Sequence, residues 1–506
     1  THHSACMFKK ILVANRGEIA RRIFRACREL GLRSVAIYSE VDRSAPWPRL
    51  ADESYQLDGF TAAETYLNQK AIFQVAKAAG ADAIHPGYGF LSENADFAEA
   101  CAAHDIHFIG PSPQAMRLLG SKAGARQLAR QVNVPVMPGM DGAGRSDHEL
   151  VAAAQAIGFP ILIKASAGGG GKGMRLVWRP DDFASALHAA RNEARSSFGN
   201  DHVLIEKYFP QVHHVEIQVL GDRHGNIVHL FERECSIQRR HQKIIEESPA
   251  PGVPAELRRQ MAEAALALAR AVGYVSAGTV EFVLEPSGRF FLLEMNTRLQ
   301  VEHPVTELVT GVDIAGWQIR LAAGEPLTFH QEHLTQHGHA IECRVYAEDP
   351  ANNFLPSTGE VVFYRPPAGP GVRVDDGIEA GTVVSPYYDP MLGKIITWGH
   401  DRAEAIRKMG RALDDTVILG VTTNVAYLHD ILREPEFLSG RTTTNFLPYH
   451  LAAWRPAVDV SHSTWLAIAA LEALHAEGHP HRPGGQPAEE AAPPDPWAQT
   501  IAWRNV

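Results

Sequence analysis

The residues best suited to chemistry lie between Lys164 and Gly173, where a run of glycines is flanked by lysines. The glycines are Gly168, Gly169, Gly170, Gly171 and Gly173. Glycine lets backbone N–H groups approach an anion closely, and lysine adds the point charge that attracts a polyphosphate. The stretch therefore predicts a loop that cradles the phosphates of a nucleotide.

The surrounding sequence separates this loop from two common phosphate loops. Gly168-x-Gly170-x-x-Gly173 satisfies the dinucleotide pattern, but that pattern opens a helix, and here an extended apolar run, 174–178, follows. The P-loop pattern fails because Gly173 stands where Ser or Thr would hold Mg²⁺. A β-hairpin remains, whose mobile tip we expect to close over ATP as a lid.

Acidic residues in two neighbouring strand-like segments predict a metal site. Glu281 lies in the apolar run 279–283, and Glu294 and Asn296 alternate at the end of the run 290–296. Spacing by two places Glu294 and Asn296 on one face of a strand. A carboxylate within an apolar run needs a partner, because burying it alone costs several kcal/mol. We therefore assign Glu281, Glu294 and Asn296 to Mg²⁺.

The turn that follows these strands carries groups for a small substrate. Arg298 offers a fork that matches a planar oxyanion, Gln300 offers an amide, and Glu302 offers a base. Two basic features point the same way: the cluster 238–243 and Arg344, which lies in a mostly apolar strand. Together they predict a pocket for a carboxylate-like anion beside the γ-phosphate.

The elements that must position these residues fall into regions along the chain. Residues 7–120 alternate strand-like and helical runs, which predicts a parallel sheet. The first turn, 14–18, has one glycine where a dinucleotide site needs three, so we expect no NAD there. A helix is expected over 112–132, and the glycine-rich 139–144 reads as a linker.

The rest of the chain predicts two further domains and a tail. Residues 121–335 hold the glycine hairpin and then strands at 203–208, 214–219, 279–284 and 290–295, which suggest an antiparallel sheet flanked by helices. Residues 336–450 are strand-rich early and carry a helix over 402–417. Residues 451–506 predict a helix, a Pro- and Gly-rich linker and the start of a following domain.

Composition excludes several classes of function. The chain has 506 residues, a formal net charge of −10 and a pI near 6.2, which offer no basic surface for nucleic acid. We find no apolar stretch near the ~18 residues of a membrane span and no signal-peptide pattern, so we expect a cytoplasmic protein without a membrane partner. The five scattered cysteines predict reduced thiols.

Four motifs closely resemble the biotin carboxylase component of biotin-dependent carboxylases, members of the ATP-grasp superfamily. They begin at Lys164 (KASAGGGGKGM), Gln238 (QRRHQK), Glu294 (EMNTRLQVEHP) and Glu342 (ECRVYAED). The resemblance runs from Phe8 to about Pro448. It implies an α/β and α+β fold: a Rossmann-like N-terminal domain, an ATP-grasp domain with a mobile glycine-rich lid over about 136–208, and a strand-rich C-terminal domain.

The resemblance also implies roles for individual residues. ATP would be bound by the glycine loop together with Lys122, Lys164, Glu206, Lys207, His214, Gln238 and His241. Bicarbonate would be held by Lys243, Arg298, Gln300, the Val301 backbone and Glu302, and Arg344 would face biotin. Glu302 would take the bicarbonate proton as ATP is cleaved to give carboxyphosphate. That intermediate would collapse to CO₂ and phosphate, the phosphate would take the ureido proton of biotin, and Arg344 would stabilise the enolate-like oxygen that results.

The same resemblance implies cofactors and partners. ATP would act with Mg²⁺ or Mn²⁺, two ions in all, and biotin would arrive on a separate carrier domain, since the chain lacks the Ala-Met-Lys-Met attachment sequence. The implied partners are that biotin carboxyl carrier, a carboxyltransferase subunit and a second copy of the chain. The segment 497–506 resembles the region after this domain in acyl-CoA carboxylase α subunits, which suggests a truncated α subunit.

Two other interpretations stay open on the residues alone. The glycine loop and the metal carboxylates would equally suit an ATP-grasp ligase that activates another carboxylate. A module that binds ATP without turning it over is the second alternative, which the 298–302 pocket disfavours.

Overall fold

The computed structural model describes residues 8–165, 174–198, 201–240, 242–457, 463 and 466–471, without the side chains of 122, 123, 165, 197 and 198. Two compact units were found, Thr1–Arg455 and Pro456–Val506. In the second unit, the described residues 463 and 466–471 are helical. Across the described ranges, no helix has the length and apolar character needed to cross a membrane.

The first unit begins with the parallel sheet that the alternating pattern predicts. Its strand order is β3-β2-β1-β4-β5, and each neighbouring pair is parallel. The strands are β1 (Lys10–Val13), β2 (Arg33–Tyr38), β3 (Glu53–Gln56), β4 (Ala83–His85) and β5 (His107–Phe108), and the helices are α1 (Gly17–Glu29), α2 (Gln69–Ala79) and α3 (Ala95–Ala103). Strand β3 was not expected, because a polar edge strand has no apolar pattern.

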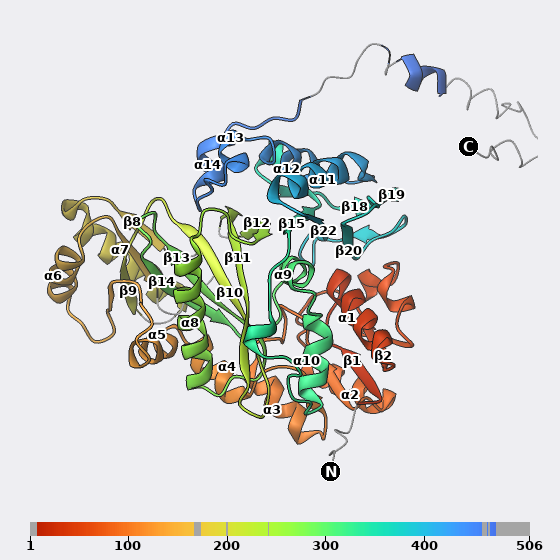
Figure 1. Ribbon diagram of the computed structural model, residues 1–506, viewed down its shortest axis with the longest axis horizontal. Coiled ribbons are helices and arrows are strands. Elements are labelled where there is room, and N and C mark those ends of the chain that lie inside the picture. The colour runs from red at the N-terminus through yellow and green to blue at the C-terminus, as the bar shows by residue number, and fades with distance from the viewer. Residues whose placement is uncertain are drawn as a thin grey trace, which may run out of the picture. The chain divides into compact units, whose positions relative to one another are not determined.

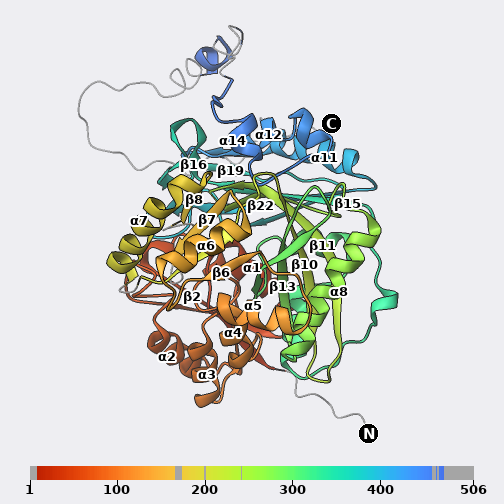
Figure 2. The ribbon, with the colours of Figure 1, turned by 90° about the vertical axis from the view of Figure 1, so that its left-hand side faces the viewer.

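A smaller sheet, in the order β6-β9-β7-β8, carries the two sides of the glycine segment. Its strands are β6 (Gly139–Asp141), β7 (Ile161–Ala165), β8 (Met174–Val177) and β9 (Val203–Lys207). Helices α6 (Asp147–Ile157) and α7 (Pro180–Phe198) pack on it, and a core of its own includes Leu150, Ile163 and Phe183. Figure 1 shows this part on the side opposite the N-terminal helices α1 and α2, and Figure 2, which turns that side toward the viewer, shows α6 and α7 in front.

Two expectations for residues 112–144 are wrong. The supposed linker contains β6, where a Cβ on Gly139 would meet the carbonyl oxygen of Ile205 at 2.4 Å, so glycine permits close strand contact rather than flexibility. The helix expected over 112–132 is broken into α4 (Pro113–Gly120) and α5 (Lys122–Gln131). Ser121 has an extended backbone and accepts a hydrogen bond from the Gly124 N–H, which starts a new helix.

The central feature is an antiparallel sheet in the order β14-β13-β10-β11-β12-β15-β22-β20 (Figure 1). It is continuous through β12 and β15, so hydrogen bonding runs across the boundary expected near 336. Its strands are β10 (His213–Gly221), β11 (Ile227–Arg239), β12 (Gln242–Ser248), β13 (Ser276–Leu284), β14 (Phe290–Asn296), β15 (His339–Tyr346), β20 (Val372–Asp376) and β22 (Met391–Gly399). Helices α8 (Ala255–Ala271), α9 (His303–Thr310) and α10 (Ile314–Ala322) pack beside it.

Short strands and helices complete the first unit. The strands are β16 (Glu348–Asp349), β17 (Leu355–Pro356), β18 (Gly359–Glu360), β19 (Phe363–Arg365), β21 (Val383–Val384) and β23 (Val417–Leu419). The helices are α11 (Arg402–Asp415), α12 (Val425–Ile431), α13 (Pro435–Leu438) and α14 (Phe446–His450). Cys27, Cys101, Cys235 and Cys343 are buried free thiols, as expected, and Cys6 lies outside the described residues.

Candidate active site

A cavity of about 1480 Å³ opens between the sheets of the first unit. Typical small-molecule pockets measure roughly 300–1,000 Å³, so this one has room for a nucleotide and a second substrate. It is lined from the N-terminal sheet, the small sheet, the central sheet and the C-terminal helices, and the predicted residues on its wall are Lys164, Glu206, Lys207, His214, Gln238, Lys243, Glu281, Glu294, Asn296, Arg298, Gln300, Val301 and Arg344.

A register shift in β14 brings the two expected metal carboxylates together. Glu281 of β13 lies directly opposite Glu294 of β14, while Phe282 pairs with Leu292, so Leu293 is an extra residue in its strand. Directly opposite residues share a face of a sheet. The shift therefore turns Glu281 and Glu294 toward the cavity and leaves Phe282 and Leu292 in the core.

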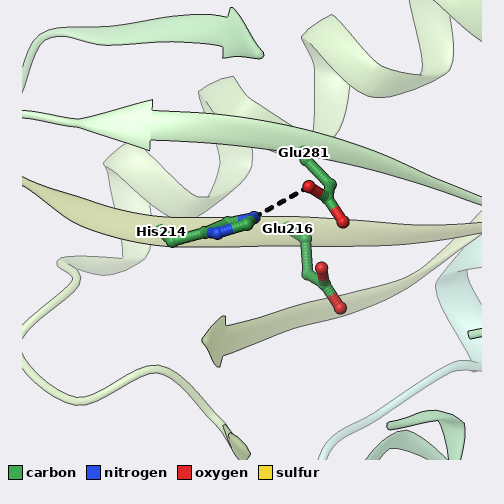
Figure 3. Close-up of side chains that lie close together, drawn as sticks. All are labelled: His214, Glu216 and Glu281. Atoms are coloured by element: carbon green, nitrogen blue, oxygen red, sulfur yellow. Dashed lines mark ion pairs between the residues drawn. The ribbon is translucent and has the colours of Figure 1, made fainter. Parts of the chain in front are cut away.

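The Glu281 carboxylate is surrounded by hydrogen-bond donors. Its Oε1 accepts from Lys243 Nζ at 2.8 Å, from Asn296 Nδ2 at 2.8 Å and from Gln300 Nε2 at 3.0 Å. His214 Nε2 lies 3.0 Å from Oε2, and Figure 3 marks this ion pair by a dashed line. Burial raises the pKa of Glu281, but Lys243 and His214 outweigh it, so the net pKa lies well below the usual range.

Lys243 lies at the centre of a group of buried carboxylates. Its Nζ is 2.5 Å from Glu216, 2.8 Å from Glu281 and 2.7 Å from Glu302. Burial lowers the pKa of Lys243, but these three charges outweigh it and raise the pKa well above normal. His214, Glu216 and Glu281 converge closely enough to hold a metal ion (Figure 3), but the lysine ammonium already neutralises that position.

Glu302 lies one layer behind the cavity wall, at the N-terminal end of α9. Its side chain is fully buried, and the two groups that cover it, Lys243 and Arg344, both line the cavity. Lys243 Nζ donates to Oε1 at 2.7 Å and an Arg344 Nη donates to Oε2 at 2.8 Å. Burial raises the pKa of Glu302, but Lys243, Arg344 and Arg233 outweigh it and hold the pKa well below its usual value. The carboxyl is therefore ionised at neutral pH.

The other residues of the expected anion pocket are held by local contacts. Arg298 Nε donates to Glu93 at 3.0 Å, and its Nη groups donate to Gln300 Oε1 at 2.8 Å and Asn296 Oδ1 at 3.0 Å. The Val301 carbonyl accepts from the fully buried Lys394 at 2.7 Å. The turn 298–302 is thus fixed on both sides, and Arg298, Gln300 and Val301 form a preformed part of the cavity wall.

Those residues expected at the nucleotide whose side chains the structure describes line the same cavity. Glu206 is paired with both Arg126 and Lys164, and Lys207 Nζ donates to the carbonyls of Gly158 and Phe159 at 3.0 and 2.8 Å. Gln238 lies across from Lys243 in the β11–β12 hairpin, so the two side chains share a face. The Lys122 side chain, Gly168, Gly169, Gly170, Gly171, Gly173 and His241 lie outside the described part of the chain.

Sequence reasoning missed several buried charges beside this site. Arg233 Nε pairs with Glu216 at 2.6 Å, and both side chains have no exposed surface. The alternation of His214, Glu216 and Gln218 with apolar residues was a usable signal, because polar residues at every second position of a buried strand line one face. Arg126, Glu246 and Lys394 gave no comparable signal, since their partners lie far away in sequence.

Family models match most of the chain. The Biotin carboxylase, N-terminal domain matches residues 7–116, the Carbamoyl-phosphate synthase L chain, ATP binding domain matches 121–330, and the Biotin carboxylase C-terminal domain matches 342–449.

Individual proteins match over similar lengths. The chain is 50% identical to the biotin carboxylase of Nostoc sp. over 440 residues, covering 87% of this chain and 98% of that protein. It is 51% identical to the human mitochondrial propionyl-CoA carboxylase alpha chain over 442 residues, covering 87% of this chain and 61% of that longer one.

Solved structures of biotin carboxylases have the same fold as this chain. The biotin carboxylase domain dimer of Hydrogenobacter thermophilus 2-oxoglutarate carboxylase, in complex with MgADP, ADP and bicarbonate, superposes with a TM-score of 0.84 at 45% identity, covering 89% of this chain and 99% of that one. A biotin carboxylase–ATP complex from Campylobacter jejuni also gives 0.84 at 45% identity, covering 88% and 99%. The chain therefore belongs to the biotin carboxylase family of ATP-dependent ligases and has the function of a biotin carboxylase.

Proposed function

We propose that this chain carboxylates carrier-bound biotin with bicarbonate, in an ATP- and Mg²⁺-dependent reaction that passes through carboxyphosphate. The observation that carries the proposal is the position of Glu302, ionised and fully buried between Lys243 and Arg344. Both of these cations line the cavity that also receives Glu281 and Glu294. Two anion-binding cations and a pair of acidic residues thus surround one space, and the base lies directly behind the two cations.

The donor set suits divalent metal. Glu281, Glu294 and Asn296 supply carboxylate and amide oxygens, which Mg²⁺ and Mn²⁺ prefer, and they face the same cavity. Bound metal would neutralise charge on the transferring phosphoryl group. The two carboxylates lie opposite each other on β13 and β14, so they would hold divalent metal together.

The residues of the anion pocket would carry the first step. Arg298, Gln300 and Lys243 would hold bicarbonate, and Glu302 would take its proton as a bicarbonate oxygen attacks the γ-phosphorus and ADP leaves. Bicarbonate that contacts Lys243 or Arg344 would draw these cations away from Glu302. The pKa of Glu302 would then rise, so the carboxylate would become a stronger base beside the proton that bicarbonate gives up. The small sheet β6–β9, with its own core, would close as the lid.

Arg344 would serve the second step. Carboxyphosphate would break into CO₂ and phosphate, and the phosphate would take the ureido proton of biotin. Arg344 would stabilise the oxyanion that results, and the deprotonated nitrogen would attack CO₂ to form carboxybiotin. Biotin would be presented by a separate carrier, and a carboxyltransferase subunit would use the product. Relatives named as acyl-CoA carboxylase alpha subunits support this setting, and a dimeric neighbour supports homodimerisation.

The test is fixation of labelled bicarbonate onto free biotin, with ADP release measured in parallel. We expect ADP release and carboxybiotin formation both to require ATP, Mg²⁺ and bicarbonate. Incorporation of the label should also require added biotin. ADP release that ignores bicarbonate but responds to another carboxylate would instead identify a different ATP-grasp ligase. Binding of ATP without any release of ADP would identify a nucleotide-binding module.

A further inference from the structure

Two buried carboxyl groups lie behind Arg344, on the side away from the cavity. Glu246 of β12 and Glu342 of β15 are directly opposite each other, and both are fully buried. Glu342 and Arg344 are two residues apart in one strand, so all three side chains share a face of the central sheet. Neither carboxyl lines the cavity, and no step of the proposed reaction uses either one.

Arg344 is shared between Glu246 and Glu302. Its Nε donates to Glu246 Oε1 at 2.6 Å, and an Nη nitrogen lies 2.5 Å from the same oxygen. An Nη also donates to Glu302 Oε2 at 2.8 Å. The two carboxylates therefore compete for one guanidinium: both contact the Nη2 nitrogen, and Glu246 alone also holds Nε.

This competition changes during the proposed reaction. When Glu302 accepts the bicarbonate proton, it loses its negative charge and most of its attraction for Arg344. Glu246 takes no proton from substrate, so its contact with the Nε edge persists. Without that contact, the freed arginine would lose its orientation at the moment when biotin must be bound.

We infer that Glu246 is a positioning residue that keeps Arg344 aimed at the cavity while Glu302 changes its charge. The inference rests on the proposed function, because it assumes that Glu302 is the base and that Arg344 serves biotin. Glu246 would act only through Arg344, since it contacts neither the cavity nor the substrates.

The charges around Glu246 predict how this role depends on pH. The net pKa of Glu246 is raised to about 7. Burial is the main cause and Glu302 adds to the rise, while Arg344 and Lys243 oppose it. Glu342 faces it from β15, and burial raises the pKa of Glu342 well above normal, although Lys394 of β22 lowers it. The Glu342 carboxyl has no hydrogen-bond partner among the described residues, so it is a neutral neighbour that does not compete for Arg344.

Protonation of Glu246 would release Arg344 below about pH 7. The ratio of biotin carboxylation to bicarbonate-dependent ADP formation should therefore fall as pH decreases through this value. The ratio is informative because both assays share the nucleotide, metal and bicarbonate steps. A pH effect on those shared steps, including the protonation of bicarbonate itself, changes both rates by the same factor and therefore cancels in the ratio.

The experiment compares Glu246→Gln with Glu247→Gln in both assays across neutral pH. Glu247 is the next residue of β12, on the other face, where it pairs with Arg402 Nε at 2.7 Å and His339 Nε2 at 2.7 Å. It is a matched control for loss of a buried carboxylate–arginine pair. We expect Glu246→Gln to lower the ratio at least ~10-fold at alkaline pH and to abolish its pH dependence. Glu247→Gln should keep the wild-type ratio and profile.

Other outcomes contradict the inference in separate ways. A wild-type ratio in Glu246→Gln, or equal losses in both assays, would show that Glu246 does not position Arg344 for biotin. A flat ratio in the wild-type protein would overturn the inference even if the variant failed to fold. Absence of bicarbonate-dependent ADP formation in the wild-type protein would refute the proposed function instead.

Discussion

Glu302 is bonded to Lys243 through one carboxylate oxygen at 2.7 Å and to Arg344 through the other at 2.8 Å. These contacts keep its pKa well below the usual value, which by itself would make Glu302 a weak base. Both partners are also the cations that an anionic substrate would contact. If Glu302 is the base, as proposed, its basicity would rise when an anionic substrate draws these cations away from it.

Glu302→Gln should fold but should not turn over bicarbonate. The amide keeps the shape of the side chain and removes the proton acceptor, so bicarbonate-dependent ADP formation should fall by about 10²- to 10⁴-fold. ADP release and the thermal unfolding midpoint are the two measurements. Wild-type ADP release from a folded variant would remove Glu302 from the role of base.

Arg344→Ala should lose far more biotin carboxylation than bicarbonate-dependent ATP cleavage. Removing one oxyanion donor typically lowers a rate by ~10²- to 10³-fold. The variant also leaves Glu246 and Glu302 without a buried cation, so Arg344→Lys should be tested beside it, with both assays run at matched folded concentration. Equal losses in the two assays would argue against a role toward biotin.

Glu294→Gln should raise the Mg²⁺ concentration needed for half-maximal ADP formation. Glu294 is partly exposed on the cavity wall, so its loss should change the unfolding midpoint little. Glu281→Gln should affect both metal dependence and stability, because Lys243 and His214 would lose a buried partner. An unchanged Mg²⁺ requirement in both variants would disprove the assigned metal site.

Glu307→Gln should destabilise the fold at neutral pH by roughly 3–5 kcal/mol, because a buried partner of two arginines is removed. Glu307 of α9 pairs with Arg22 and Arg373, each at 2.8 Å. Burial raises the pKa of Glu307, but Arg22, His303 and Arg373 hold the net pKa well below normal.

The pH dependence of that difference has a defined sign. Because the folded pKa of Glu307 is depressed, its contribution is present above the unfolded value of 4.5 and is lost as pH falls toward the folded pKa. Urea unfolding at neutral and acidic pH should therefore show the variant and the wild type converging in acid. A constant difference would mean that packing, rather than charge, explains the loss.

The parts of the fold and site that could be predicted are those with local signals. The alternating strand-like and helical runs of 7–120 predict the parallel sheet. Asn296, Arg298 and Gln300 are close in sequence, so their closeness in the site could also be predicted. Contacts between distant segments could not be foreseen. Lys394 holds the Val301 carbonyl from 93 residues away, and Glu246 reaches Arg344 across 98.

Local patterns also misled where packing overrides propensity. Glycines in 139–144 indicate a turn, yet Gly139 lies in a strand because no side chain fits against Ile205. The period-two pattern of β14 does not reveal the extra residue Leu293. That residue is what places Glu294 beside Glu281. The assignment of both carboxylates to one metal site, which stays a prediction, was therefore made without knowledge of the strand irregularity that brings them together.

The most direct test of the central claim follows oxygen from bicarbonate into phosphate. With ¹⁸O-labelled bicarbonate, ATP and Mg²⁺, attack of a bicarbonate oxygen on the γ-phosphorus should leave one labelled oxygen in each phosphate released. Carbonic anhydrase, which exchanges the label with water beforehand, should abolish the signal and serves as the control. Phosphate whose new oxygen comes from water would contradict the account, because ATP would then be hydrolysed rather than used to activate bicarbonate.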